Sequence, residues 1–211
     1  MLVKTIMTEN VKTLKETDTI EQAMTLMNAY NIRHVPIVDE DRHVVGLVTD
    51  KDINLALPSI LSEETNVTMN HSLKEIMKKN IISTSEYDFV EELAVDFHQF
   101  DLGAVPVVKN RKLIGIVTQT DIMSAFIEIT GMKHPGSIIE IDVFDKPGIV
   151  HDIGHTMKEL KVRIVSITIY DNREKPNHKV VVLKVNAMNP QRAIDALLEK
   201  GFDVINPHRM E

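Results

Sequence analysis

Val45-Gly46-Leu47-Val48-Thr49-Asp50-Lys51-Asp52-Ile53 is the stretch of sequence that decides the fold. Its apolar residues predict a strand that contains one glycine, and Thr49 followed by Asp52 predicts the start of a helix. The same pattern returns in Ile114-Gly115-Ile116-Val117-Thr118-Gln119-Thr120-Asp121-Ile122. Each copy places a hydroxyl and a carboxylate at a corner between a strand and a helix. We therefore expect two copies of one structural unit and of one site.

The repeat extends on the N-terminal side of both corners. Val3–Met7 aligns with Leu73–Met77, and Val35–Val38 aligns with Val105–Val108. The register holds with a single gap, which falls in the loop just before the corner. One copy of this size buries too little apolar surface to be secure alone, so the two copies are expected to pack as a pair.

Each copy opens with a short helix, near Ile6-Met7 in the first copy, and an extended piece, at 11–14 there, and continues with a main set of a first helix, two strands and a second helix. The first helix follows Thr17-Asp18-Thr19, which offers N-cap residues, and its apolar positions are spaced i, i+3, i+4 and i+7. These positions are Ile20, Ala23, Met24 and Met27 in the first copy, and Val90, Leu93, Ala94 and Phe97 in the second. The strands are expected at 35–38, 44–48, 105–108 and 113–117, and the second helices at 54–57 and 122–130.

The residues after 137 follow a different pattern. Strands are expected at 138–143, 162–170, 179–185 and 202–205, with helices after the turn Asp145-Lys146-Pro147-Gly148 and after Asn189-Pro190. The order βαββαβ is that of a ferredoxin-like split βαβ sheet. The fold class is therefore mixed, α/β (α+β), and the predicted domains are 1–58, 72–131 and 138–208.

Composition limits the classes of function. The chain has 211 residues, a net charge of −7, and a hydrophobic content of 43% that is sufficient for a buried core. It has no tryptophan and no basic face, so no nucleic-acid partner is expected. It has no cysteine, no secretory signal and no apolar run long enough to span a membrane. We expect a cytoplasmic protein that does not bind membranes.

Each corner has two interpretations. A threonine followed three residues later by an aspartate is a common helix N-cap, and for one copy alone this interpretation is favoured. Duplication in a matched context favours a ligand site, because a carboxylate suits ribose hydroxyls, while a hydroxyl and helix N–H groups suit phosphate. The glycine before each corner allows a ligand or another part of the backbone to come close.

Residues 3–130 resemble tandem CBS domains, known together as a Bateman module. The resemblance rests on the motif Gly-hydrophobic-x-Thr-x-x-Asp and on the hydrophobic-Pro-hydrophobic strand that precedes it. It implies that each motif aspartate binds ribose and each motif threonine lies beside the phosphates of AMP, ATP or a related adenosine effector, with no cofactor required. The implied nucleotide-binding residues are Thr13, Arg33, His34, Val35, Pro36, Thr49, Lys51 and Asp52 in the first copy, and Ser83, Ala104, Val105, Pro106, Thr118 and Asp121 in the second.

The first copy is richer in positive charge than the second. The aligned pairs that differ are Arg33 and Gly103, His34 and Ala104, and Lys51 and Thr120. Arg33 and Lys51 are either phosphate ligands or surface charges exposed to solvent. If they bind phosphate, the two sites should have unequal affinities, and the first corner should take the more highly charged ligand.

Residues 138–206 resemble an ACT domain, on the element order and on Asp145-x-Pro147-Gly148. The resemblance implies a small ligand, often an amino acid, held near Asp145, Pro147 and Gly148 at an interface between two such domains. The alternative is a dimerisation module in which Pro147-Gly148 only begins a helix. His151 and His155 on that helix could chelate a metal, but no third ligand is evident, so no metal is expected.

The order CBS–CBS–ACT resembles the acetoin utilisation proteins of spore-forming bacteria. This implies a cytoplasmic homodimer that senses adenine nucleotides and regulates a partner enzyme of acetoin or butanediol catabolism. No Walker loop, dinucleotide fingerprint or nucleophile elbow is present, so the chain itself is not expected to be an enzyme. The alternatives are a structural dimerisation protein with vestigial ligand sites, and an amino-acid sensor that uses the ACT domain.

Overall fold

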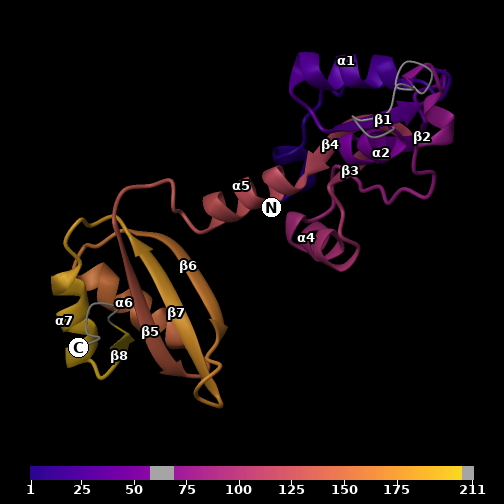
Figure 1. The fold of residues 1–211 in the computed structure, drawn as a ribbon. Coiled ribbons are helices and arrows are strands. Elements are labelled where there is room, and N and C mark those ends of the chain that lie inside the picture. The colour runs from indigo at the N-terminus through magenta and orange to yellow at the C-terminus, as the bar shows by residue number, and fades with distance from the viewer. Residues whose placement is uncertain (58–68, 206–211) are drawn as a thin grey trace. The chain divides into compact units, whose positions relative to one another are not determined.

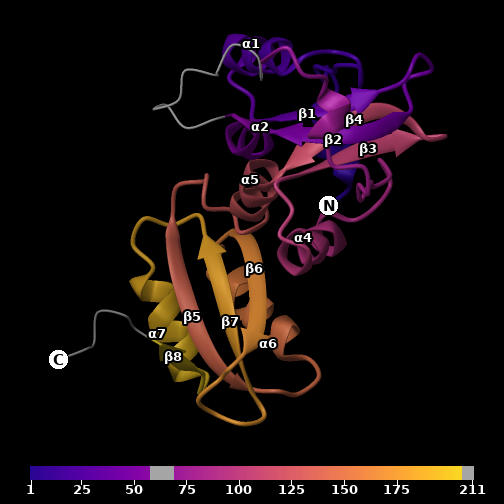
Figure 2. The ribbon, with the colours of Figure 1, turned by 45° about the vertical axis from the view of Figure 1, so that its right-hand side comes forward.

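The structure is a computed structural model that describes residues 1–57 and 69–205. The chain divides into two compact units, one up to Ala125 and one from Phe126 onward (Figures 1 and 2). Most of the segment that joins the two sequence repeats, and the last residues predicted for the third domain, lie outside the described residues. No helix in the described ranges is long and apolar enough to cross a membrane.

The first unit contains two matching sets of elements. The first helix of each set is amphipathic as predicted, and it buries Ile20, Ala23 and Met27 in one copy and Val90, Leu93 and Phe97 in the other. The first set consists of α1 (Ile20–Tyr30), β1 (His34–Val38), β2 (Val44–Thr49) and α2 (Asp50–Ala56). The second set consists of α4 (Val90–Gln99), β3 (Ala104–Lys109), β4 (Lys112–Thr118) and α5 (Gln119–Ile129). Two short 3-10 helices, η1 (Val3–Thr5) and η2 (Leu73–Glu75), are the other elements that the structure describes in this unit.

Helix α1 begins at a capping box. The Gln22 N–H donates to Oγ1 of Thr19 over 3.3 Å, and the Thr19 N–H donates to Oε1 of Gln22 over 2.8 Å. Two donors that the first turn cannot satisfy internally are thereby paired. The predicted N-cap is confirmed at Thr19.

Each set builds a small sheet around an antiparallel pair. Strand β1 pairs with β2, and β3 pairs with β4. A third segment joins each pair in parallel through a single bridge, from Leu14 to Ile37 in one copy and from Thr84 to Val107 in the other. Val35 and Val105 are fully buried at the centre of the two cores.

The two repeats exchange their N-terminal segments. Val3 packs in the core of the second set, and Leu73 and Met77 pack in the core of the first. The exchange also uses backbone hydrogen bonds, because Thr8 bridges Ile116 and Lys78 bridges Leu47 in the same antiparallel manner. Each core is therefore incomplete without a segment of the other repeat, which explains why the repeats occur as a pair.

The glycine of each repeated motif makes room for this exchange. A β-carbon on Gly46 would overlap the side chain of Met77, and one on Gly115 would overlap the side chain of Met7. The sequence predicted a ligand or backbone close to this glycine, whereas the nearest atoms belong to a side chain. The neighbour is a methionine from the exchanged segment, together with the bridging backbone that follows it.

The second unit is a four-stranded antiparallel sheet with two helices. Its strand order is β6-β7-β5-β8, and the chain order βαββαβ agrees with the prediction. The elements are β5 (Ser137–Phe144), α6 (Ile149–Glu159), β6 (Ile164–Asp171), β7 (His178–Val185), α7 (Gln191–Glu199) and β8 (Asp203–Ile205). Helices α6 and α7 bury Ile153, Met157, Ala193 and Leu197 against the same face of the sheet. This places one core between the helical layer and the sheet (Figure 1).

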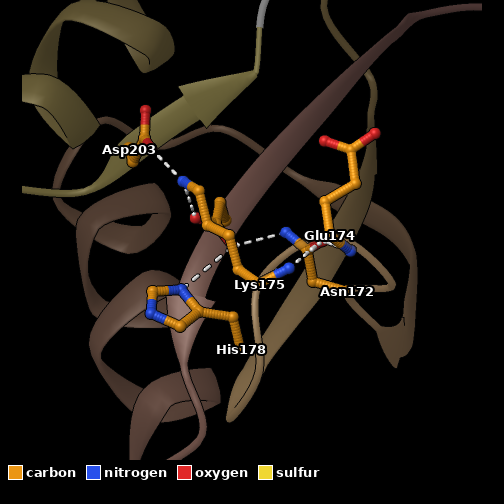
Figure 3. A network of polar contacts seen from close by, with 6 residues as sticks. Asn172, Glu174, Lys175, His178 and Asp203 are labelled. Carbon is orange, nitrogen blue, oxygen red and sulfur yellow. Dashed lines mark hydrogen bonds and ion pairs between the residues drawn. The ribbon is translucent and has the colours of Figure 1, made fainter.

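A buried carboxylate ties the β6–β7 hairpin to β5. Ile141 and Val143 face the helices, so Asp142 between them points to the opposite face of the sheet. Its side chain is 3% exposed and accepts hydrogen bonds from three donors of the hairpin (Figure 3). These are Nζ of Lys175 at 2.5 Å, Nδ2 of Asn172 at 2.9 Å and Nδ1 of His178 at 3.1 Å.

Replacement of Gly154 by alanine should stabilise the second unit. Gly154 lies inside α6, its φ is not in the left-handed region, and a β-carbon there would meet no atom within 4 Å. The alanine is expected to raise the free energy of unfolding by about 0.5–1 kcal/mol, because it restricts the unfolded chain and favours helix. Chemical denaturation of the full chain measures this. An unchanged or lower value would contradict the prediction.

Candidate functional site

Both repeated corners form a helix N-cap. The Thr49 N–H and Oγ1 both donate to Oδ2 of Asp52, over 2.9 Å and 2.7 Å, and the Asp52 N–H donates back to Oγ1 of Thr49 over 3.2 Å. Thr118 and Asp121 repeat this arrangement with distances of 2.7 Å, 2.7 Å and 3.4 Å. The N-cap interpretation of the motif is therefore confirmed. It does not exclude a ligand, because each corner also borders a cavity.

The first cavity lies at the second corner, and we name it the Thr118 cavity. It has a volume of about 270 Å³ and combines several chain segments with Gly103. The segment 8–12 and the start of β1 come from the first repeat, and the end of β4 with the start of α5 comes from the second. Its lining residues are Thr8, Asn10, Val11, Lys12, Asn31, Ile32, Arg33, His34, Gly103, Ile116, Thr118, Gln119 and Thr120.

The second cavity lies at the first corner, and we name it the Thr49 cavity. It has a volume of about 310 Å³ and is built from the corresponding segments with the roles of the repeats exchanged. Asn80 takes the place of Asn10, and Ala104 takes the place of His34. Its lining residues are His34, Leu47, Thr49, Lys78, Asn80, Ile81, Ile82, Phe100, Asp101, Leu102, Gly103 and Ala104.

Each cavity is thus composite, with the corner of one repeat facing the strand start of the other. The sequence alone had associated Arg33 and Lys51 with the first corner. In the structure Arg33 lines the Thr118 cavity, together with Thr118 of the other repeat. Lys51 is exposed on α2 and lines neither cavity. Arg33, which was expected at the first corner, thus also lines a cavity at the second, while its backbone oxygen accepts from the N–H of Asp50 at the first corner.

Several predicted site residues lie outside the lining of both cavities. Val35, Pro36, Val105 and Pro106 are buried in the strands of the cores and are not lining residues of either cavity. Thr13 and Ser83 also lie outside the lining residues, and Ser83 is exposed. Asp52 and Asp121 are not lining residues themselves, but each accepts a hydrogen bond from the hydroxyl of a threonine that lines a cavity.

Sequence reasoning missed most of the polar cavity residues, among them two asparagines and two lysines. Asn10 and Asn80 are identical at aligned positions, and this identity was a signal that could have found them. Lys12 has Ile82 as its counterpart, so no repeated pattern marked it. Lys78 reaches the Thr49 cavity through the exchanged segment, for which no local sequence signal exists. Its Nζ lies 3.7 Å from Oδ1 of Asp52.

His34 and Gly103 line both cavities. A β-carbon on Gly103 would overlap Nε2 of His34, so glycine is needed opposite the imidazole. Burial lowers the pKa of His34, although the carboxylates of Asp50 and Asp52 act to raise it. The imidazole is therefore neutral at neutral pH, and its ring separates the two cavities as an uncharged wall.

The second unit has a larger cavity near the predicted small-ligand residues. Gly148 is the N-cap of α6 with a φ of 90°, and Asp145 and Pro147 are exposed in the turn before it. These three residues do not line the cavity, although their neighbours Lys146 and Ile149 do. The cavity has a volume of about 760 Å³ and is lined by Asp142, Val143, Phe144, Lys146, Ile149, His151, Asp152, His155, Lys175, His178, Lys200, Gly201, Phe202 and Asp203.

The two histidines of α6 are paired with each other and with acids. The rings of His151 and His155 stack with their centroids 6.2 Å apart. Nε2 of His155 lies 3.2 Å from Glu159, and Nδ1 of His151 lies 3.4 Å from Asp152. Within residues 1–57 and 69–205, no group of three or more histidine, cysteine or acidic side chains is placed to hold a metal ion.

Two intertwined repeats with a composite cavity at each threonine corner define a tandem-repeat module. The CBS domain profile matches residues 3–59 and 73–128, which is more than half of the chain. The chain belongs to the CBS domain family, and its two matched segments form a CBS pair.

Three relatives illustrate the similarity. A CBS domain-containing protein of Dictyostelium discoideum is 31% identical over 143 residues, which are 65% of this chain and 99% of that protein. The CBS domain pair of protein MJ0100, solved with 5′-methylthioadenosine and S-adenosyl-L-methionine, is 32% identical with a TM-score of 0.53, over 64% of this chain and 98% of that one. A Vibrio cholerae protein named as an acetoin utilization protein (AcuB) is 30% identical with a TM-score of 0.55, over 63% and 96%.

Relatives that are named as enzymes match over a small part of their length. The chain spans 24% of the homoserine O-acetyltransferase of Methanococcus vannielii, at 30% identity. The similarity to such proteins is therefore a shared CBS segment.

Proposed function

We propose that the CBS pair binds adenosine ligands in the Thr118 and Thr49 cavities and acts as a regulatory module. The observation that carries this proposal is the pair of matched composite cavities, each of which has a motif threonine in its wall. A threonine hydroxyl and the first N–H groups of a helix suit the phosphate or ribose of a nucleotide. The CBS pair of MJ0100, which matches 64% of this chain, was solved with two adenosine ligands.

The composite construction supplies a way to transmit binding. Each cavity is lined by both repeats, so a ligand contacts both at once. A ligand that binds one arrangement of the repeats more tightly shifts the population toward that arrangement. The second unit or a partner enzyme would then respond to the change. On this proposal the chain regulates another activity and is not itself an enzyme.

The wider role follows the similarity to the Vibrio cholerae protein named AcuB. On this basis we assign the chain to the regulation of acetoin or butanediol catabolism, as a cytoplasmic homodimer that responds to AMP, ATP or a related effector. Purification of the chain with the acetoin-cleaving enzyme of its host, and assay of that enzyme with and without nucleotide, tests this role. An enzyme rate that the chain does not change would contradict it.

The second unit supports a second candidate function. Its βαββαβ order and the Gly148 turn suit an ACT domain that binds an amino acid. The specific observation is the cavity of about 760 Å³ beside the start of α6, which contains both acidic and basic side chains. Equilibrium dialysis with a mixture of the twenty amino acids tests it. If none is retained, the unit serves as a dimerisation module.

Ligand-induced stabilisation tests adenosine binding at the two corners. A ligand at a hundredfold excess over its Kd should raise the free energy of unfolding by about 2.7 kcal/mol. Asp52→Asn and Asp121→Asn each keep a side-chain oxygen for the N-cap but remove the negative charge behind one cavity. Each variant is expected to lose part of the thermal shift produced by AMP, ATP or 5′-methylthioadenosine.

The two variants are controls for each other, because they make the same change at equivalent positions. Unfolding without ligand gives the baseline of each protein. Thermal shifts equal to those of the parent would remove these carboxylates from ligand recognition. No shift with any adenosine compound in the parent would favour a structural dimerisation protein with vestigial sites.

A further inference from the structure

The two cavities are built alike, so their charges can be compared position by position. Lys12 of the Thr118 cavity corresponds to Ile82 of the Thr49 cavity, and Arg33 corresponds to Gly103. His34 lines both and is neutral at neutral pH, so it does not distinguish them. The difference between the cavities therefore lies in the remaining charged side chains.

The Thr118 cavity carries an excess of positive charge. Its charged lining residues are Lys12 and Arg33, and no aspartate or glutamate of the described residues lines it. Nζ of Lys12 lies 4.2 Å from the centre of the Tyr30 ring, a cation–π contact that does not neutralise its positive charge. Thr118 and Thr120 line the cavity at the start of α5, and the hydroxyl of Thr118 already donates to Asp121. A guanidinium, an ammonium and hydroxyls together are suited to several phosphate oxygens.

The Thr49 cavity is balanced in charge and more apolar. Lys78 is its only basic residue apart from His34 among the described residues, and its Nζ lies 3.7 Å from Oδ1 of Asp52. Asp101 adds a negative charge to the same lining. The apolar residues of the wall are Leu47, Ile81, Ile82, Phe100 and Leu102. A chain of phosphates would bring several negative charges to a wall with no net positive charge.

We propose that the Thr118 cavity takes an adenine nucleotide with phosphates, while the Thr49 cavity takes an adenosine ligand whose 5′ group carries no negative charge. This assignment rests on the proposed adenosine binding of the CBS pair. On this assignment the module binds two different classes of ligand, one in each cavity, instead of the same ligand twice. It also reverses the expectation from sequence, in which the first corner takes the more highly charged ligand.

Isothermal titration calorimetry of the full chain with ADP and with 5′-methylthioadenosine tests the assignment. Arg33→Gln removes a cation from the Thr118 cavity, and Lys78→Gln is the matched change in the Thr49 cavity. Both side chains are exposed, so both variants should fold like the parent, and thermal unfolding verifies this. Arg33→Gln is expected to weaken ADP about tenfold and to leave 5′-methylthioadenosine unchanged, whereas Lys78→Gln leaves ADP unchanged.

Competition provides a second measurement. Protein saturated with 5′-methylthioadenosine should still bind one ADP, and the ADP affinity should fall with added salt because exposed cations supply it. If Lys78→Gln weakens ADP while Arg33→Gln does not, or if the two ligands exclude each other, the assignment is wrong although adenosine binding stands. If neither ligand binds the parent, the proposed function fails, and the assignment fails with it.

Discussion

Asp142→Ala is expected to destabilise the second unit by about 2 kcal/mol, because three hydrogen bonds to a buried carboxylate are lost at once. The carboxylate joins Lys175, Asn172 and His178 of the hairpin to β5. Asn172 also orders the hairpin internally, since its Oδ1 accepts from the N–H groups of Glu174 and Lys175 (Figure 3). In native-state hydrogen exchange, the backbone amides of β6 and β7 should be the first to lose protection.

A double-mutant comparison separates this network from a general effect of the substitution. Lys175→Met alone leaves the buried carboxylate with two donors and should destabilise the unit. In the Asp142→Ala background the same change should have a smaller effect, because only the exposed contact between Lys175 and Asp203 remains to be lost. Asp142→Asn, which keeps an acceptor oxygen, should cost less than Asp142→Ala. Additive effects of the two changes would show that Lys175 and Asp142 do not act together.

The same network predicts how stability depends on pH. Burial acts to raise the pKa of Asp142, but the hydrogen bonds from Lys175, Asn172 and His178 outweigh it and hold the pKa below its usual value. The stabilisation by Asp142 is therefore complete above the pKa of aspartate in the unfolded chain, about 3.9. It is lost as the pH falls through the lower pKa that Asp142 has in the folded protein. The difference in stability between the parent and Asp142→Ala should shrink below about pH 4. A difference that stays constant into acid would contradict this.

Gly103→Ala is expected to reduce ligand affinity in both cavities and to destabilise the first unit by about 1–3 kcal/mol through overpacking. The new methyl group would overlap Nε2 of His34, whose ring separates the cavities. The φ of Gly103 is not in the left-handed region, so the backbone tolerates alanine and the effect comes from the contact. Denaturation and calorimetry of the same variant measure the two consequences.

The double variant His34→Ala/Gly103→Ala provides the decisive control. Removing the imidazole makes room for the new methyl group, so this protein should be more stable than Gly103→Ala alone. The interaction energy between the two sites should be about 0.5–3 kcal/mol, the range found for residues in contact. If Gly103→Ala is as stable as the parent and binds ligand equally well, the imidazole moves freely and is not a fixed wall.

The sequence predicted most of the elements because their signals are local. Apolar spacing located α1 and α4, and Thr19 began the first helix as expected. The predicted strands differ from the observed ones mainly at their ends, where the choice between strand and turn depends on neighbouring chain. The second helices begin at Asp50 and Gln119, directly after the motif threonine, as the Thr-x-x-Asp pattern predicted.

The composition of each cavity could not be predicted from one repeat. The alignment placed Arg33 beside the first corner, whereas it lines the cavity of the second. The exchange of residues 1–8 and 72–78 between the repeats produces this crossing, and it depends on contacts between residues far apart in the chain. Val35 and Val105 show a second limit of the sequence. An apolar residue beside a motif is as suited to a buried core as to a pocket wall, so the sequence does not decide between the two places.

The sequence by itself determined that the chain contains two copies of one unit, each with a Thr-x-x-Asp corner, and a βαββαβ unit after them. It could do so because repeats, capping residues and apolar periods are properties of neighbouring residues. Only the tertiary structure decided that the corners face the opposite repeat, that Met7 and Met77 fill the space above the motif glycines, and that His34 stands between two cavities of unlike charge. The physical reason is that each core is completed by a segment of the other repeat, so the lining of a cavity is fixed by packing across the pair.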